Sequence, residues 1–152
     1  MVNVVRSPEL EEFARLGRRK FEEGDAAWFD RTTAHGDIAS FGTAPGEESR
    51  GREDVLRLTI DEISEMDAAA GVDIARDQPA DEFAVEAYQA GDAGWIVTHD
   101  SFRLPDGTTF SNRVITVAVR DDEGWKTVLT ASQLLVPNEL LVPGSPLGSG
   151  GD

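Results

Sequence analysis

The sequence predicts an α+β fold in which a curved antiparallel sheet is covered on its concave face by N-terminal helices. Three observations predict it. Apolar residues recur at helical spacing in the first part of the chain, while strand-like segments separated by short turns fill the second part. The length of 152 residues suits one domain with its own core. A twisted sheet covered on one side curls and encloses a pocket.

The first helix is expected to begin at Ser7 and Pro8, a hydroxyl N-cap followed by proline at the first helical position. Gly24 ends it. Its apolar stripe consists of Leu10, Phe13, Ala14, Gly17 and Phe21. A short second helix follows, capped by Asp25 and carrying Trp28 and Phe29. The two helices are expected to form a lid with an aromatic elbow.

A strand is expected over His35–Phe41, a turn-rich loop over Gly42–Gly51, and a third helix over Glu53–Ala70. Val72–Pro79 is interpreted as a short strand followed by a loop. The remaining strands form a meander joined by turns rich in glycine and aspartate. They are Phe83–Gln89, Trp95–Leu104, Thr109–Arg120 and Trp125–Val136. We expect one domain over residues 1–142 and a flexible tail of glycine, serine and proline over 143–152.

Composition restricts the function. The formal net charge is −15, with 29 acidic residues against 14 basic ones. Such a surface repels phosphate backbones and anionic headgroups, so neither nucleic acid nor a membrane is an expected partner. Cysteine is absent, which excludes disulfides and thiolate chemistry. Met1–Leu10 lacks the apolar stretch of a secretory signal, and we expect a cytoplasmic protein.

Four short motifs resemble the SnoaL-like branch of the nuclear-transport-factor-2-like superfamily. Together they cover most of the chain, in the order and spacing of that branch. They are GTAPGEESRGRED (Gly42–Asp54), GW with FRLPDG (Gly94–Gly107), Arg113 followed by GWK (Gly124–Lys126), and VPNE (Val136–Glu139).

The resemblance implies a cone-shaped half-barrel with a pocket between sheet and helices, in a homodimer. Relatives include polyketide cyclases, ketosteroid isomerases, dehydratases, epoxide hydrolases and non-enzymatic binding or assembly modules, so the fold does not fix the chemistry. Many members carry a histidine on the last strand and a serine two positions later. Leu129–Glu139 contains Ser132 but no histidine, so no imidazole mechanism is expected there.

The register of the central hairpin follows if Asp106 and Gly107 are its two turn residues, because Asp100 then faces Arg113. We assign that face to the pocket. It also carries Ile96, Thr98, Phe102, Leu104, Ile115 and Val117. The stretch around Asp100 resembles the ketosteroid isomerase strand that presents a protonated acid. A guanidinium across the strand would instead stabilise the ionised carboxylate, which cannot donate to an oxyanion.

Each candidate has two interpretations. Asp100 and Arg113 are the catalytic candidates, as base and orienter, or they form a cross-strand ion pair that holds the register. The aromatic and polar candidates line a ligand pocket or simply pack the core. They are Trp28, Phe29, Phe41, Thr98, Phe102, Ile115, Val117, Thr130 and Ser132. No metal site and no cofactor are expected, since the two histidines lie far apart.

The expected function is binding of a small, largely apolar molecule, with a lyase, cyclase or isomerase reaction as the chemistry if the protein is an enzyme. The alternative is a non-enzymatic dimeric sensor or assembly module with a vestigial pocket. A homodimer is expected in both cases.

Overall fold

The computed structural model describes residues 1–43, 45–69, 75–76, 84–103 and 107–136, with the backbone alone at 65–69, 75–76 and 102–103. Three helices and eight strands lie in this part of the chain. In order they are β1 (Val5–Arg6), α1 (Pro8–Glu22), α2 (Ala26–Thr32), β2 (Ala39–Phe41), β3 (Glu48–Arg50), α3 (Arg52–Ala69), β4 (Ala75–Arg76), β5 (Ala84–Ala90), β6 (Ala93–Arg103), β7 (Thr109–Asp121) and β8 (Gly124–Leu135). Among the described helices, none combines the length and the apolar character needed to cross a membrane.

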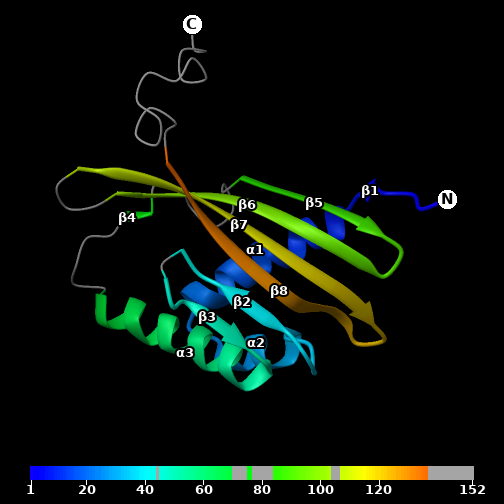
Figure 1. The fold of residues 1–152 in the computed structure, drawn as a ribbon, viewed down its shortest axis with the longest axis horizontal. Helices are drawn as coiled ribbons and strands as arrows, with labels where there is room; N and C mark the ends of the chain where they lie inside the picture. Colours follow the sequence, from blue (N-terminus) through cyan, green and yellow to red (C-terminus); the bar gives the residue numbers. More distant parts are fainter. Residues whose placement is uncertain (44, 70–74, 77–83, 104–106, 137–152) are drawn as a thin grey trace, which may run out of the picture.

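One curved, unclosed sheet contains these strands in the order β1-β5-β6-β7-β8-β2-β3, and β4 pairs with the far end of β6. All pairings are antiparallel except that of β2 with β8. The helices lie on one side of the sheet, with α1 across its middle and α3 beside β2 and β3 (Figure 1). The predicted α+β class, the meander from β5 to β8 and the helical cover are therefore confirmed.

The segment after α2 differs from the expectation. The strand is shorter than His35–Phe41, because Gly36 has a φ of 95° and the backbone turns there before it reaches β8. The expected loop contains β3, which forms a hairpin with β2. The Gly42 N–H donates to the Glu47 carbonyl at 2.7 Å and closes that hairpin. Residues 137–152, including the expected tail, lie outside the described part.

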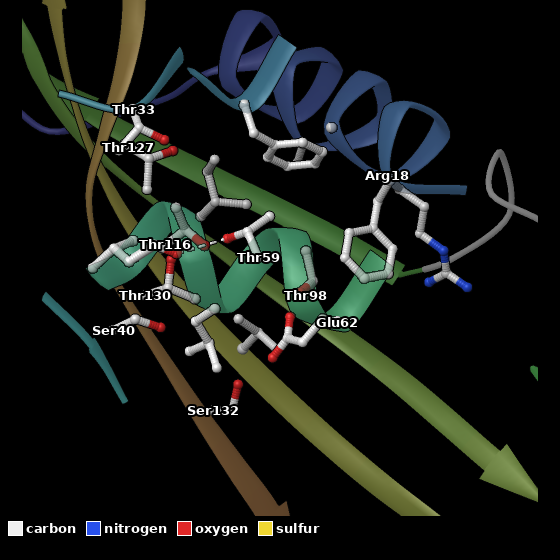
Figure 2. Close-up of a pocket in the computed structure, with 18 of the residues that line it drawn as sticks. Arg18, Thr33, Ser40, Thr59, Glu62, Thr98, Thr116, Thr127, Thr130 and Ser132 are labelled. Carbon is white, nitrogen blue, oxygen red and sulfur yellow. Dashed lines mark hydrogen bonds between the residues drawn. The ribbon is translucent and has the colours of Figure 1, made fainter. Parts of the chain in front are cut away.

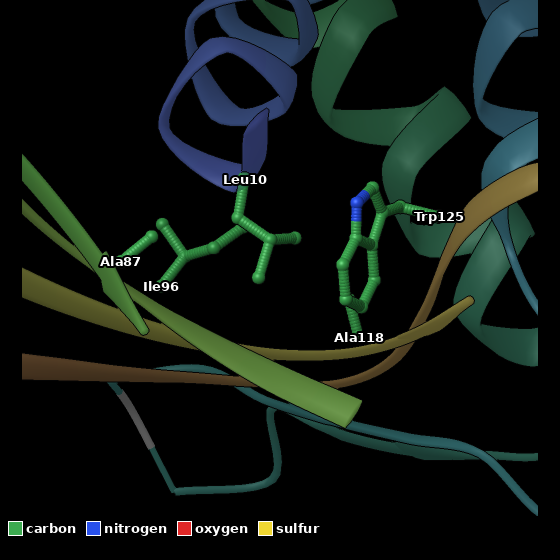
Figure 3. Close-up of a cluster of buried hydrophobic side chains, with 5 residues drawn as sticks. All are labelled: Leu10, Ala87, Ile96, Ala118 and Trp125. Carbon is green, nitrogen blue, oxygen red and sulfur yellow. The ribbon is translucent and has the colours of Figure 1, made fainter. Parts of the chain in front are cut away.

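The N-terminus of α1 is fixed by Ser7, which is 1 % exposed. Its hydroxyl accepts from the Leu10 N–H at 3.3 Å and donates to Oε1 of Gln89 on β5, so the cap also joins the helix to the sheet. Leu10 is fully buried and packs in a cluster with residues from the sheet (Figure 3). The other members are Ala87, Ile96, Ala118 and Trp125.

Gly94 lets α1 approach the sheet closely. A Cβ atom there would collide with the side chain of Leu10 and would lie 2.7 Å from the Tyr88 carbonyl oxygen. The core therefore sits under the first half of α1, which leaves space under its second half.

A β-bulge interrupts the pairing of β7 with β8. Val117 faces Leu129, but Ala118 faces Thr127, so Val128 is the extra residue. A bulge bends the strand and increases its twist, which adds to the curvature of the sheet.

Candidate functional site

A cavity of about 520 Å³ lies between the helices and the concave face of the sheet (Figure 2). This volume is within the range of roughly 300 to 1,000 Å³ typical of small-molecule sites. The site therefore has room for a ligand, and its walls determine what kind.

The helical wall of the cavity is aromatic. Trp28 lies at the centre, with ring centroids 5.4 Å from Phe13 and 4.9 Å from Phe29, the latter edge to face. Phe29 in turn meets Phe21 at 6.1 Å. Gly17 makes room for the indole, because a Cβ atom there would lie 3.2 Å from it. The expected aromatic elbow between the two helices is confirmed.

Asp25 holds the start of the helix that carries Trp28. Its carboxylate accepts from the Trp28 N–H at 3.0 Å and lies 3.2 Å from Lys20 Nζ. The hydrogen bond from the Trp28 backbone, and then Lys20, lower the pKa of Asp25 below its usual 3.8. The orientation of the aromatic wall thus depends on a charged cap.

The sheet side of the cavity is rich in hydroxyl groups, as Figure 2 shows. Apolar residues such as Ile96 and Val114 lie between them. The hydroxyl-bearing side chains contributed by the strands are Ser40, Thr98, Thr116, Thr127, Thr130 and Ser132.

An ion pair lies among the residues that line the cavity. Arg18 on α1 donates from Nη1 to both carboxylate oxygens of Asp100 on β6, each at 2.9 Å. Its Nε donates to Glu22 at 3.1 Å. The side chains of Arg18 and Asp100 are 6 % and 18 % exposed. The guanidinium, which contacts both Glu22 and Asp100, fixes the orientation of the Asp100 carboxylate.

The predicted pairing of Asp100 with Arg113 is wrong. Asp100 lies opposite Asn112, and Arg113 lies opposite His99. The last pair of the hairpin is Arg103 with Thr109, so the connection is not the assumed two-residue turn. A shift of one residue moves every side chain of β7 to the other face.

The same shift removes Ile115 and Val117 from the cavity, since they share the convex face with Arg113. Of the other expected lining residues, Phe102 belongs to β6, but its side chain lies outside the described part. The remaining ones do line the cavity: Trp28, Phe29, Phe41, Thr98, Asp100, Thr130 and Ser132.

Sequence reasoning missed Arg18, Thr116 and Thr127. A signal for Arg18 exists, because it stands one turn after Ala14 and so falls on the apolar stripe of α1. No such signal exists for Thr127. It faces the cavity together with Thr130 only because the bulge at Val128 changes the alternation of β8.

The described residues contain no group of three or more histidine and acidic side chains that could hold a metal ion. His35 and His99 are both exposed, and His99 lies on the convex face. The ionisable and hydroxyl groups among the described lining residues are carboxylates, a guanidinium and hydroxyls.

No family model matches the sequence, and no curated protein matches it significantly. Solved structures do. An uncharacterised protein with a cystatin-like fold from Caulobacter vibrioides aligns with a TM-score of 0.59 at 15 % identity, over 88 % of this chain and 90 % of that one. An NTF2-like protein from Pseudomonas putida aligns with a TM-score of 0.58 at 12 % identity, over 85 % of this chain and 89 % of that one. This chain has the NTF2-like fold.

Two further structural neighbours are described by function, and the first of them is NTF2-like. A candidate dehydratase from Streptomyces avermitilis aligns with a TM-score of 0.57 at 14 % identity, over 84 % of this chain and 92 % of that one. A candidate association domain of calcium/calmodulin-dependent protein kinase type II from Thiobacillus denitrificans aligns with a TM-score of 0.56 at 19 % identity, over 88 % of this chain and 99 % of that one. At such identities the likeness extends to the fold alone.

Proposed function

We propose that this NTF2-like chain belongs to the SnoaL-like branch and binds a small molecule in the cavity between α1, α2 and the concave sheet. The observation that carries the proposal is the cavity of about 520 Å³, which is lined by five aromatic rings and by the Arg18–Asp100 pair. A protein that needed this space only as core would fill it, because interiors are packed as densely as organic crystals.

The chemistry that fits the site is proton transfer by Asp100 in a cofactor-independent lyase, cyclase or isomerase step. Its carboxylate is the acceptor, and Arg18 holds it in one orientation. Arg18 takes the place that the sequence assigned to Arg113. A candidate dehydratase of the same fold is consistent with this class of reaction.

Occupancy of the cavity can be tested with a substitution that fills it. Thr116→Phe places a ring on the cavity floor, while Ile115→Phe places the same ring on the opposite face of β7. Binding of 2-naphthol is measured by calorimetry. We expect one site in the wild type and in Ile115→Phe, and none in Thr116→Phe. No binding to the wild type, or equal binding to both variants, would refute the proposal.

Enzymatic activity is tested by trapping. An enzyme that has lost its base accumulates unconverted substrate, so extraction of purified Asp100→Asn followed by mass spectrometry should yield a compound that the wild type does not carry. If both proteins carry the same compound, Asp100 is not a base and the binding function alone remains.

The second candidate is a non-enzymatic assembly module, which the neighbour from Thiobacillus denitrificans favours.

For both candidate functions we propose a homodimer formed through the convex face of the sheet. Tyr88 and Trp95 stack there at 5.7 Å beside Val97 and Val117, and the described helices all lie on the other side (Figure 1). Sedimentation of the wild type as a dimer and of Val97→Glu as a monomer supports this interface; a monomeric wild type refutes it.

A further inference from the structure

Three hydroxyl groups form one row across the floor of the cavity. Thr116 on β7 lies directly opposite Thr130 on β8, and Thr130 lies beside Ser40 on β2. Figure 2 shows all three side chains on the cavity side of the sheet. Neighbouring strands are about 4.8 Å apart, so the row presents hydroxyls at that spacing.

These hydroxyls have no hydrogen-bond partner in the described part of the chain. The same is true of Thr33, which also lines the cavity and is only 8 % exposed. None of these four hydroxyl oxygens is among the buried side-chain atoms that lack a hydrogen-bond partner in the described part of the chain. Each hydroxyl is therefore open to the cavity, where water or a ligand can form a hydrogen bond with it.

Two other threonines on the same cavity differ in this respect. The hydroxyl of Thr32 donates to the Trp28 carbonyl at 2.9 Å, and that of Thr59 donates to the Val55 carbonyl at 3.1 Å. Both bonds stay within a helix. The helical threonines are thus satisfied by the backbone, whereas the row on the sheet is open to a ligand.

The charges of the cavity oppose an anionic ligand. Arg18 is the single cation among the described lining residues, and it is engaged by Asp100 and Glu22. Glu47 and Glu62 also line the cavity. A carboxylate or phosphate would meet like charges and a guanidinium that is already paired.

From these contacts we infer that the row of Ser40, Thr116 and Thr130 binds the oxygen-bearing edge of a neutral ligand whose apolar body packs against Trp28. The inference rests on the proposed binding function and names its ligand class: an uncharged ring compound with two or more hydroxyl or carbonyl oxygens along one edge. Hydroxyls suit such an edge because each can both donate and accept.

Three probes of similar shape test it: naphthalene, 1,3-dihydroxynaphthalene and 2-naphthoate. The two hydroxyls of the diol have a spacing similar to that of the strands. We expect the diol to bind about tenfold or more tightly than naphthalene, as two hydrogen bonds would give, and 2-naphthoate to bind more weakly than the diol.

Isosteric substitutions locate the effect. Thr130→Val and Thr116→Val should each weaken binding of the diol about three- to tenfold and leave naphthalene unchanged. Thr59→Val is the matched control, since it removes a hydroxyl on the same cavity that is already bonded to the helix; it should change neither affinity. Ser40→Ala tests the third hydroxyl of the row, and it should weaken binding of the diol by the same factor as Thr130→Val and Thr116→Val.

Equal binding of naphthalene and the diol, tighter binding of 2-naphthoate, or an equal loss in Thr59→Val and Thr130→Val would overturn the inference while leaving the cavity a binding site. Absence of binding by all three probes would overturn the proposed function as well.

Discussion

One nitrogen atom of Arg18 contacts both carboxylate oxygens of Asp100, at 2.9 Å each, although the two residues are 82 positions apart in the chain. The contact joins α1 to β6 at the end of the cavity. Arg18 thus has two roles, one in attaching the helical wall to the sheet and one in orienting the carboxylate that faces the cavity.

Removal of either partner should destabilise the fold. Arg18→Met leaves Asp100, which is 18 % exposed, without the guanidinium that contacts it, and Asp100→Leu leaves Arg18, which is 6 % exposed, with Glu22 as its remaining carboxylate contact. We expect each to lower the free energy of unfolding by about 2–4 kcal/mol, near the lower end of the range for buried pairs, because Asp100 keeps some contact with water. Urea denaturation measures it.

The double variant Arg18→Met/Asp100→Leu should recover most of that loss, since it buries no unpaired charge. Arg57→Met removes an exposed pair with Asp54 and serves as the control, with a change of roughly 0–1 kcal/mol. Additive losses in the double variant would show that the two charges are not coupled.

Gly94→Ala should destabilise the fold much more than Gly17→Ala does. Gly94→Ala forces a Cβ atom against Leu10 and the Tyr88 carbonyl, and the backbone cannot yield cheaply. We expect a loss of about 1–3 kcal/mol. Gly17→Ala lies within α1, where alanine is favoured by up to about 1 kcal/mol, and meets only the edge of Trp28 at 3.2 Å. The melting temperatures of both variants measure this difference. A similar decrease in melting temperature for Gly94→Ala and Gly17→Ala would contradict this account of how closely α1 approaches the sheet.

The lowered pKa of Asp25 predicts that the stability of the fold depends on pH. Its pKa is lowered in the folded state, so its charge stabilises the fold fully above the unfolded value of 3.8 and progressively less as the pH falls through the folded value. Asp25→Asn keeps a capping oxygen but removes the charge. The difference in unfolding free energy between wild type and this variant should be largest at neutral pH and decrease below about pH 4. A difference that grows on acidification would contradict the assignment.

The elements of the fold follow from local chemistry. The cap at Ser7, the stop at Gly24 and the apolar stripe of α1 are contained in a few consecutive residues, and the structure has them as predicted. Within one strand, period-2 alternation correctly keeps Thr98 with Asp100 and Thr130 with Ser132 on the face of the cavity.

Relations between strands were less predictable. The pairing of β6 with β7 depends on the length of their connection. An error of one residue in the predicted register placed Arg113 opposite Asp100, whereas Asn112 lies there in the structure. The bulge at Val128 changes the alternation again without a sequence signal. Arg18 approaches Asp100 only through the crossing of α1 over the sheet, which depends on packing at Leu10 and Gly94.

Methyl NMR spectroscopy with 1,3-dihydroxynaphthalene tests the central claim, that the concave side of the sheet binds a ligand. Thr116 and Thr130 face the cavity as a cross-strand pair, and their neighbours Val117 and Leu129 form the next pair on the opposite face. The proposal predicts that the methyl signals of the two threonines shift on titration while those of Val117 and Leu129 stay in place. Shifts confined to the Val117–Leu129 side, or no shift on either face, would contradict it.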